Sequence, residues 1–152
     1  MRTSTIRADF VEYVPERLDD GVLYISERYK TASHKCCCGC GEEVVTPLGP
    51  ADWSVRVEGD KVSMHPSIGN WKFCCRSHYV IRRDQVVWAG AMRASQIAQV
   101  ELQDRVDKVR HIEAINKAKE VAPVVAAEVE DLQKPVWTSW LRRIWQALIN
   151  WW

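Results

Sequence analysis

Six cysteines in one short stretch are the feature that most constrains this chain. All of them lie between residues 36 and 75, in two tight clusters: Cys36, Cys37, Cys38 and Cys40, followed by Cys74 and Cys75. The first residues of the sequence do not resemble an export signal, and no apolar run is long enough to span a membrane, so we expect a cytoplasmic protein. Clustered cysteines in such a protein predict a metal site and not a disulfide framework.

The spacing of the first cluster requires a bend in the chain. Cys36, Cys38 and Cys40 alternate, and an extended strand would hold alternate sulfurs about 6.6 Å apart. That separation is too large for a tetrahedral site with zinc–sulfur bonds of about 2.3 Å. The chain must curl here, and Gly39 and Gly41 permit this because glycine accepts backbone angles that other residues resist.

We expect Cys75 to supply the fourth ligand, with Cys74 and His34 as alternatives. Four such ligands would make a closed structural site for one Zn²⁺ per chain, on which the stability of the domain depends. Two other interpretations stay open, an iron–sulfur centre and ordinary buried thiols. For Cys37 and for Cys74, each taken singly, an ordinary thiol is the preferred interpretation, because a four-coordinate site has no room for them.

For residues 1–90 the sequence predicts a β-rich zinc-binding domain of short antiparallel strands. Short β-prone runs alternate with turn residues, and Glu58-Gly59-Asp60 and Arg83-Asp84 are typical of hairpin turns. The expected strands cover residues 22–26, 43–45, 53–58, 62–64, 79–82 and 85–88.

The composition changes after residue 90, which predicts a helical C-terminal tail and an α+β protein overall. Residues 91–122 lack glycine and proline, and apolar residues recur every three or four positions, as in one long amphipathic helix. Pro123 is expected to end this helix. Residues 123–134 then form a linker or a short helix, and residues 135–152 form a tryptophan-rich amphipathic helix.

The last predicted helix presents a stripe of tryptophans, among which Trp140 and Trp145 are the candidate partner-binding residues. The first interpretation is that this stripe packs on the chain's own helix or on a second copy, which would give a homo-oligomer. A partner protein ranks second. Contact with a membrane surface ranks last, because Arg142 and Arg143 are thin support for lipid binding.

The charge balance disfavours a nucleic-acid partner. Lys and Arg total 21 against 20 Asp and Glu, and the net charge is +1. The sequence therefore lacks the basic footprint of a nucleic-acid-binding domain.

A serine and a histidine follow the first cysteine cluster, at Ser67 and His78. Ser67 could act as a nucleophile if His78 lay within about 3 Å to accept its proton. Backbone amides of residues 68–70, or the Asn70 side chain, could stabilise an oxyanion. The plain alternative is that Ser67 caps a turn and His78 hydrogen-bonds in the domain interior. The candidate orienting carboxylates are Glu42, Glu43 and Asp52.

Several blocks of the sequence together resemble one known family. They are Leu23-Tyr24-Ile25-Ser26, His34, the stretch from Cys36 to Gly41, Val45-Thr46-Pro47-Leu48, Asp52-Trp53, Pro66-Ser67-Ile68-Gly69-Asn70-Trp71, Cys75-Arg76-Ser77-His78-Tyr79 and Trp88-Ala89. In order and spacing they resemble the bacterial family catalogued as domain of unknown function 6527. The resemblance covers about residues 15–89 and leaves the helical tail outside it.

The resemblance implies a zinc-binding domain from bacterial operons that also encode E1-like and E2-like enzymes and ubiquitin-like proteins, in pathways related to antiphage defence. It implies a serine peptidase that processes or deconjugates the ubiquitin-like protein. By position, the family's cysteines match Cys36, Cys38, Cys40 and Cys75, and its serine and histidine match Ser67 and His78. Cys74 stands where a proline is common.

The alternative function is a non-catalytic zinc-binding adaptor that docks the ubiquitin-like protein or its E1-like and E2-like enzymes. A third function, catalysis by the zinc itself, is disfavoured because four thiolates leave no open coordination position. Such catalysis would instead need water and His34 or His65 at the metal.

Overall fold

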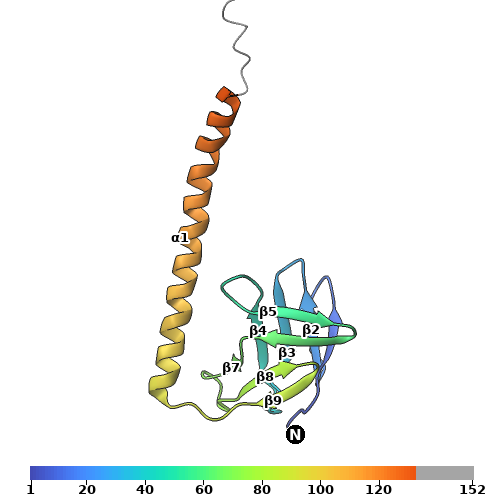
Figure 1. Ribbon diagram of the computed structural model, residues 1–152. Coiled ribbons are helices and arrows are strands. Elements are labelled where there is room, and N and C mark those ends of the chain that lie inside the picture. Colours follow the sequence, from blue (N-terminus) through green and yellow to red (C-terminus); the bar gives the residue numbers. More distant parts are fainter. Residues whose placement is uncertain (133–152) are drawn as a thin grey trace, which may run out of the picture. The chain divides into compact units, whose positions relative to one another are not determined.

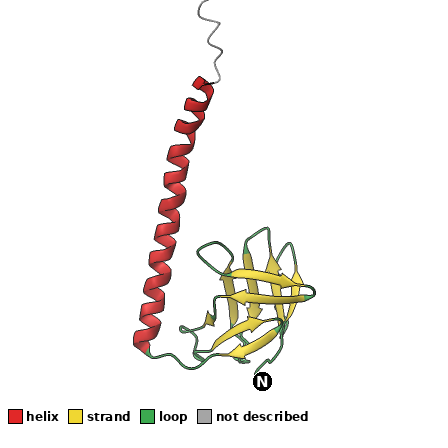
Figure 2. Ribbon diagram, in the orientation of Figure 1, coloured by secondary structure: helices red, strands yellow, loops and turns green. Residues whose placement is uncertain are grey.

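The computed structural model describes residues 1–132, and the side chains of residues 1–120. By its contacts the chain forms two units, residues 1–111 and 112–152. Nine strands precede one helix in the described residues (Figures 1 and 2). They are β1 (Arg7–Phe10), β2 (Val22–Ser26), β3 (Thr31–Lys35), β4 (Glu43–Pro47), β5 (Ser54–Glu58), β6 (Lys61–His65), β7 (Ile68–Gly69), β8 (His78–Arg82), β9 (Gln85–Trp88) and α1 (Ala94–Leu132).

The strands form three small sheets, which confirms the expected β-rich region followed by a helix. The sheets have the orders β1-β2-β3-β4, β5-β6 and β7-β8-β9. Consecutive strands within them are antiparallel, as predicted, except that β1 pairs with β2 in parallel. A parallel pair needs a crossover, which residues 11–21 supply.

Three strands were missed by the sequence pattern, each for a physical reason. The central residues of β3 are Ala32, Ser33 and His34, all buried, so polar side chains lie where the pattern expects apolar ones. Strand β7 has only two residues, fewer than any periodicity can reveal. Strand β1 has a half-buried Ala8 and Asp9 and an exposed Phe10. Its place comes from pairing with β2, not from a pattern of its own.

Both predicted hairpin turns are present. Gly59, which connects β5 to β6, has a φ of 66°. Arg83 and Asp84, which connect β8 to β9, have φ values of 45° and 66°. Two successive residues with positive φ are the signature of the tight hairpin turn whose twist matches that of the strands. The register of β8 against β9 is therefore set by this turn, with Arg82 opposite Gln85.

One hydrophobic core joins the three sheets. It includes Leu23 and Ile25 from β2, Met64 from β6, and Tyr79 and Ile81 from β8, each at most 1% exposed. Cys36 and Cys37 belong to the same cluster of buried residues. Cys36, the first cysteine of the predicted metal site, is thus part of the hydrophobic core.

Helix α1 is longer than predicted. It runs from Ala94 to Leu132, so Pro123 does not end it. Proline removes one hydrogen bond from a helix interior, but its fixed φ near −65° is helical, and the alanine and glutamate around it favour helix. Leu102, Val109 and Ile112 of the predicted apolar stripe are exposed. The predicted helix over residues 135–152, with Trp140 and Trp145, lies outside the described residues.

The domain boundaries predicted at residues 90, 122 and 134 remain predictions. The described part of the chain holds no helix that combines the length and the hydropathy needed to cross a bilayer.

We expect Ile81→Ala to lower the free energy of unfolding by about 3 kcal/mol, because it opens a cavity in a core that the three sheets share. Val87→Ala on the neighbouring strand β9 is the control, since Val87 is 45% exposed and its loss should cost less than 1 kcal/mol. Denaturant titrations of the two variants and the wild type make the measurement. Equal losses would show that the face of β8 that carries Ile81 is not the core.

Candidate functional site

The first cysteine cluster lies in a tight loop between β3 and β4, bent as its spacing predicted. The amide of Gly39 donates to the carbonyl of Cys36 over 3.0 Å, and the amide of Cys36 donates to the carbonyl of Glu42 over 2.8 Å. Gly39 and Gly41 have φ values of 83° and 87°, which a side chain would strain. The loop thereby folds back on itself and turns alternate sulfurs toward one point.

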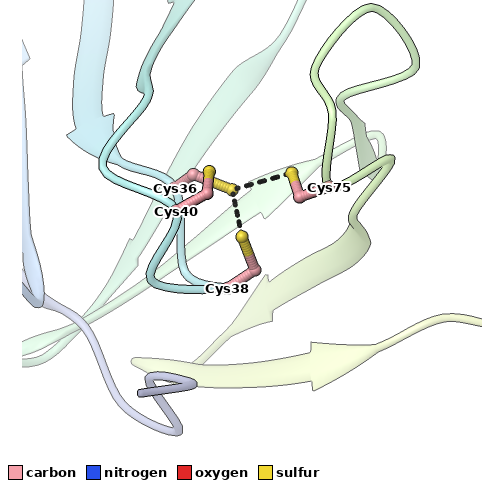
Figure 3. Close-up of side chains that lie close together, drawn as sticks. All are labelled: Cys36, Cys38, Cys40 and Cys75. Carbon is pink, nitrogen blue, oxygen red and sulfur yellow. Dashed lines mark hydrogen bonds between the residues drawn. The ribbon is translucent and has the colours of Figure 1, made fainter.

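Four sulfurs meet at that point, three from this loop and one from the loop between β7 and β8 (Figure 3). The ligand atoms of Cys36, Cys38, Cys40 and Cys75 all lie within 4.8 Å of one another. The sulfur of Cys36 is 3.4 Å from that of Cys38 and 3.8 Å from that of Cys75. Tetrahedral zinc–sulfur bonds of about 2.3 Å place sulfurs about 3.8 Å apart, so the four cysteines could hold a metal ion of this kind.

The thiols of the cluster differ in how readily they ionise. Burial, together with hydrogen bonds to the side chains of neighbouring cysteines, raises the pKa of Cys38. Burial also opposes ionisation of Cys75, but hydrogen bonds from the side chain and backbone of Ser77 outweigh it and lower its pKa to about 7. Four thiolates this close would repel one another in the absence of a cation. Metal binding would therefore release protons.

A shell of hydrogen bonds supports the sulfurs from within the domain. The Ser77 hydroxyl lies 3.1 Å from the sulfur of Cys36 and 3.5 Å from that of Cys75. Asn70 donates its side-chain amide to the Ser77 hydroxyl over 2.9 Å and also faces the Cys36 sulfur at 3.6 Å. The backbone amide of Asn70 donates to the carbonyl of Ser77, which closes the loop that carries Cys75. Groups of this kind orient metal ligands.

The two alternative fourth ligands lie elsewhere. Cys74 is exposed and outside the cluster. His34 is buried beside Tyr79, with its Nε2 atom 2.8 Å from the Tyr79 hydroxyl, and burial lowers its pKa to about 4. Cys37 is buried in the core, and burial raises its pKa to about 11. None of these three side chains joins the four sulfurs.

Ser67 and His78 form a hydrogen-bonded pair. The Nε2 atom of His78 lies 3.0 Å from the Oγ atom of Ser67. Strand β7 follows Ser67 directly and pairs with the start of β8, with Gly69 opposite His78. Ile68 and Tyr79, which are opposite each other, point into the core, so Ser67 and His78 share the outer face. The pairing of two residues brings an oxygen and a base within proton-transfer distance.

The second ring nitrogen of His78 faces a backbone carbonyl. Nδ1 lies 3.3 Å from the carbonyl oxygen of Gly90, just beyond β9. A carboxylate was expected there, but Glu42 and Glu43 are exposed beside the cysteine loop, and Asp52 forms an ion pair with Lys108. Among the hydrogen bonds of the described residues, His78 has none to these three side chains. A main-chain carbonyl can hold the imidazole orientation and tautomer as a carboxylate would.

The Asn70 side chain is also placed differently from the expectation. Its amide donates toward the cysteine site, to Ser77 and Cys36 and, over 3.5 Å, to the Tyr79 hydroxyl. The Asn70 side chain supports the cysteine cluster and is not available as an oxyanion donor while these contacts hold. Of the donors that the sequence suggested, the backbone amides of residues 68–70 are left, and the amide of Asn70 is already bound to the carbonyl of Ser77.

The indole of Trp71 contacts His78, a relation that the sequence did not indicate. The two ring centres are 4.9 Å apart and tilted by 60°. A Cβ atom at Gly69 would lie 2.4 Å from the indole ring, so the ring lies against bare backbone there. Glycine opposite His78 therefore makes room for a tryptophan on the histidine. The Gly-x-Trp spacing is the only signal in the sequence, and it becomes meaningful only once Gly69 is known to pair with His78.

Comparison with known proteins gives one family. The model of the family described as bacterial ubiquitination-like system serine protease (BubE) matches residues 10–89, more than half of the chain. This match confirms the bacterial ubiquitination-like association that the resemblance implied, under a name other than the domain-of-unknown-function number. No curated protein and no solved structure matches the chain.

We expect Cys75→Ser to lose bound metal and to lower the melting temperature, while Cys74→Ser next to it keeps both. The first sulfur belongs to the four-sulfur cluster, and the second is exposed. Metal content by mass spectrometry and thermal unfolding, with and without a chelator, make the comparison. Equal metal content in the two variants would contradict the assignment of the fourth ligand.

Proposed function

Because the chain belongs to the BubE family of bacterial ubiquitination-like system serine proteases, we propose that it cleaves a ubiquitin-like protein at that protein's C-terminal end, with Ser67 as nucleophile and His78 as general base. The cleavage would mature a precursor or release the ubiquitin-like protein from a target. The 3.0 Å contact between Ser67 Oγ and His78 Nε2 is the observation that supports these roles.

The chemistry assigned to the pair is acyl transfer. Ser67 Oγ attacks the carbonyl carbon of the scissile bond while His78 Nε2 takes the hydroxyl proton. The tetrahedral intermediate collapses, the bond to nitrogen breaks, and His78 gives its proton to the leaving amine. A water molecule, activated by the same histidine, then hydrolyses the acyl-enzyme. The Gly90 carbonyl keeps the His78 ring turned toward Ser67 throughout.

The four cysteines have a structural role in this proposal. Cys36, Cys38, Cys40 and Cys75 would hold one Zn²⁺, which supplies a closed four-thiolate centre with no open position for substrate. The loop that carries Cys75 runs from the end of β7 to the start of β8. Fixing Cys75 therefore restrains β7, which follows Ser67 directly, and β8, which begins at His78, without placing the metal in the reaction.

The adaptor function is the alternative outcome. A domain that binds the ubiquitin-like protein or its conjugation enzymes stably, but never cleaves, would fit the same family association. The tryptophans proposed for such docking, Trp140 and Trp145, lie outside the described residues. Stable binding by the wild type in the absence of turnover would select the adaptor.

We expect Ser67→Ala and His78→Ala each to reduce cleavage of the ubiquitin-like protein of the same bacterial system by at least about a thousandfold, because each removes half of the nucleophile–base pair. The measurement is cleavage of a C-terminally extended precursor, followed by electrophoresis and mass spectrometry. Metal content and melting temperature should stay at wild-type values.

Ser4→Ala and His111→Ala are the matched controls, since neither side chain is hydrogen-bonded to Ser67 or His78, whose contacts are with each other and with Gly90, and both variants should cleave normally. Unchanged cleavage by Ser67→Ala would overturn the proposed nucleophile. Loss of metal and unfolding in the same variant would give Ser67 a structural role.

A second expectation concerns the packing on His78. Trp71→Ala should lower kcat by about tenfold by freeing the imidazole to leave its position, and Gly69→Ala should act in the same direction by displacing the indole. Because both act through one contact, the double variant should be no worse than the worse single variant. Additive losses in kcat would show that the two residues act separately.

A further inference from the structure

A hollow lies beside Ser67 on the outer face of the domain. It has a volume of about 610 Å³ and contains no residue of the cysteine site. Strands β5, β6 and β8 and the segment that follows β6 line it, with Ser67 as one of the lining residues. Among the others, Arg56 and Glu58 come from β5, Ser63 from β6, and Val80 and Arg82 from β8.

Strands β6 and β8 both line the hollow, and they belong to different sheets. At one end the amide of Asp84 donates to the carbonyl of Val62, and the amide of Arg83 donates to the Ser63 hydroxyl. At the other end β7 pairs with β8 at Tyr79 and His78. The two strands belong to different sheets, so no strand-to-strand ladder fills the space between these two junctions.

Strand β8 runs along the hollow from His78 towards Arg82. His78, Val80 and Arg82 alternate with the buried Tyr79 and Ile81, so the three side chains share the outer face. A strand advances about 3.3 Å per residue, which places Arg82 about 13 Å from His78. An extended peptide of about four residues therefore spans the distance from the serine–histidine pair to Arg82.

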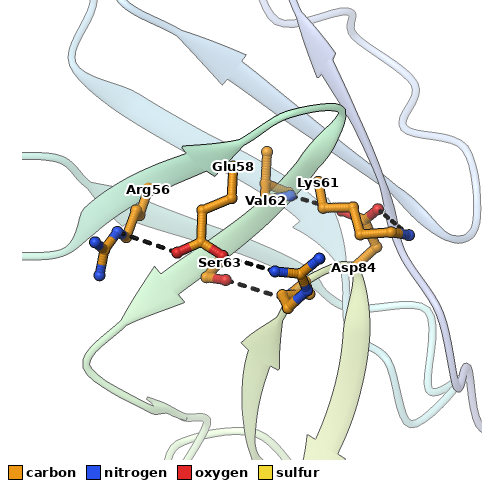
Figure 4. Close-up of polar contacts among 7 residues, drawn as sticks. Arg56, Glu58, Lys61, Val62, Ser63 and Asp84 are labelled. Atoms are coloured by element: carbon orange, nitrogen blue, oxygen red, sulfur yellow. Dashed lines mark hydrogen bonds and ion pairs between the residues drawn. The ribbon is translucent and has the colours of Figure 1, made fainter.

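The far end of the hollow has an excess of positive charge. Glu58 forms ion pairs with Arg56 at 3.3 Å and with Arg83 at 3.0 Å, so one carboxylate serves two guanidinium groups (Figure 4). Asp84, on the same turn, pairs with Lys61. Arg82 is exposed and forms no ion pair with any side chain of residues 1–120. A carboxylate from outside would find an unpaired partner there.

We propose that this hollow binds the substrate's tail as an extended peptide, and that Arg82 selects an acidic residue about four positions from the cleaved bond. The inference rests on the proposed function, since it uses Ser67 as the point where the bond is cut. The occupant is a peptide because polar and charged side chains (among them Arg56, Glu58 and Arg82) and apolar side chains (among them Met64 and Val80) line the hollow together, and because Ser67 is one of its lining residues. Arg82 thereby acts as a specificity-determining residue.

Fluorescence anisotropy with the full-length Ser67→Ala chain tests the proposal without requiring turnover. The probes are dye-labelled ten-residue peptides from the C-terminal end of the ubiquitin-like protein, with Glu, Gln or Lys placed at one position at a time. We expect the Glu peptide to bind about fivefold more tightly than the Lys peptide at one position, about four residues from the cleaved bond, and at no other. The preference should weaken at high salt.

Charge reversal supplies the decisive variant. Arg82→Glu should invert the preference, so that the Lys peptide binds more tightly at that same position. Arg17→Glu is the matched control, because Arg17 is exposed, lies before β2 and forms no hydrogen bond or ion pair among the described residues. A melting temperature equal to that of the wild type shows that Arg82→Glu folds.

Equal affinity for the Glu and Lys peptides at every position would overturn the inference, and so would a preference that Arg82→Glu leaves unchanged. Binding of none of the peptides would overturn it as well. Cleavage by the wild type separates this failure from that of the proposed function. Serine-dependent cleavage with no charge preference would remove the role of Arg82 only, whereas absence of cleavage would remove the peptidase.

Discussion

The meeting of four sulfurs from two loops is the constraint on which the rest of the domain depends. The loop between β3 and β4 brings three of them, and the loop between β7 and β8 brings Cys75. These loops belong to different sheets, and 34 residues separate Cys40 from Cys75 in the chain. A metal ion bound by the four sulfurs would cross-link segments that are far apart in the chain, and the stabilisation from such a link grows with the length of chain that it closes. Small domains with limited cores gain stability from such a site.

The consequences of that cross-link extend to the serine and the histidine. Asn70 and Ser77 join the ends of the Cys75 loop and contact the sulfurs, and the strands on either side of them are β7 and β8. Only two residue pairs hold β7 to β8, too few to fix a register by themselves. The loop therefore contributes to the register, and the register sets the distance from Ser67 to His78.

The sequence predicted those elements that are determined by residues close together in the chain. Periodicity and turn residues located β2 and the β8–β9 hairpin, and the curl at Gly39 and Gly41 followed from bond lengths alone. Relations created by pairing could not be predicted in this way. Trp71 lies on His78 because Gly69 is opposite that histidine, and Asn70 turns to the cysteines because its loop closes on Ser77. Pro123 was predicted to end the long helix because proline usually breaks a helix interior. The helix in the structure continues through Pro123 to Leu132.

The contact between His78 and the carbonyl of Gly90 does not depend on which amino acid occupies position 90. The group that faces Nδ1 of His78 belongs to the main chain, so every amino acid at position 90 would supply it. Substitution cannot delete it, and a survey of side chains would overlook it. Its position, however, depends on the path of the chain where β9 ends, which the bond from the Ala89 amide to the His78 carbonyl secures. The histidine is thus held by the course of the backbone, and a shift of that segment would release it while leaving every side chain intact.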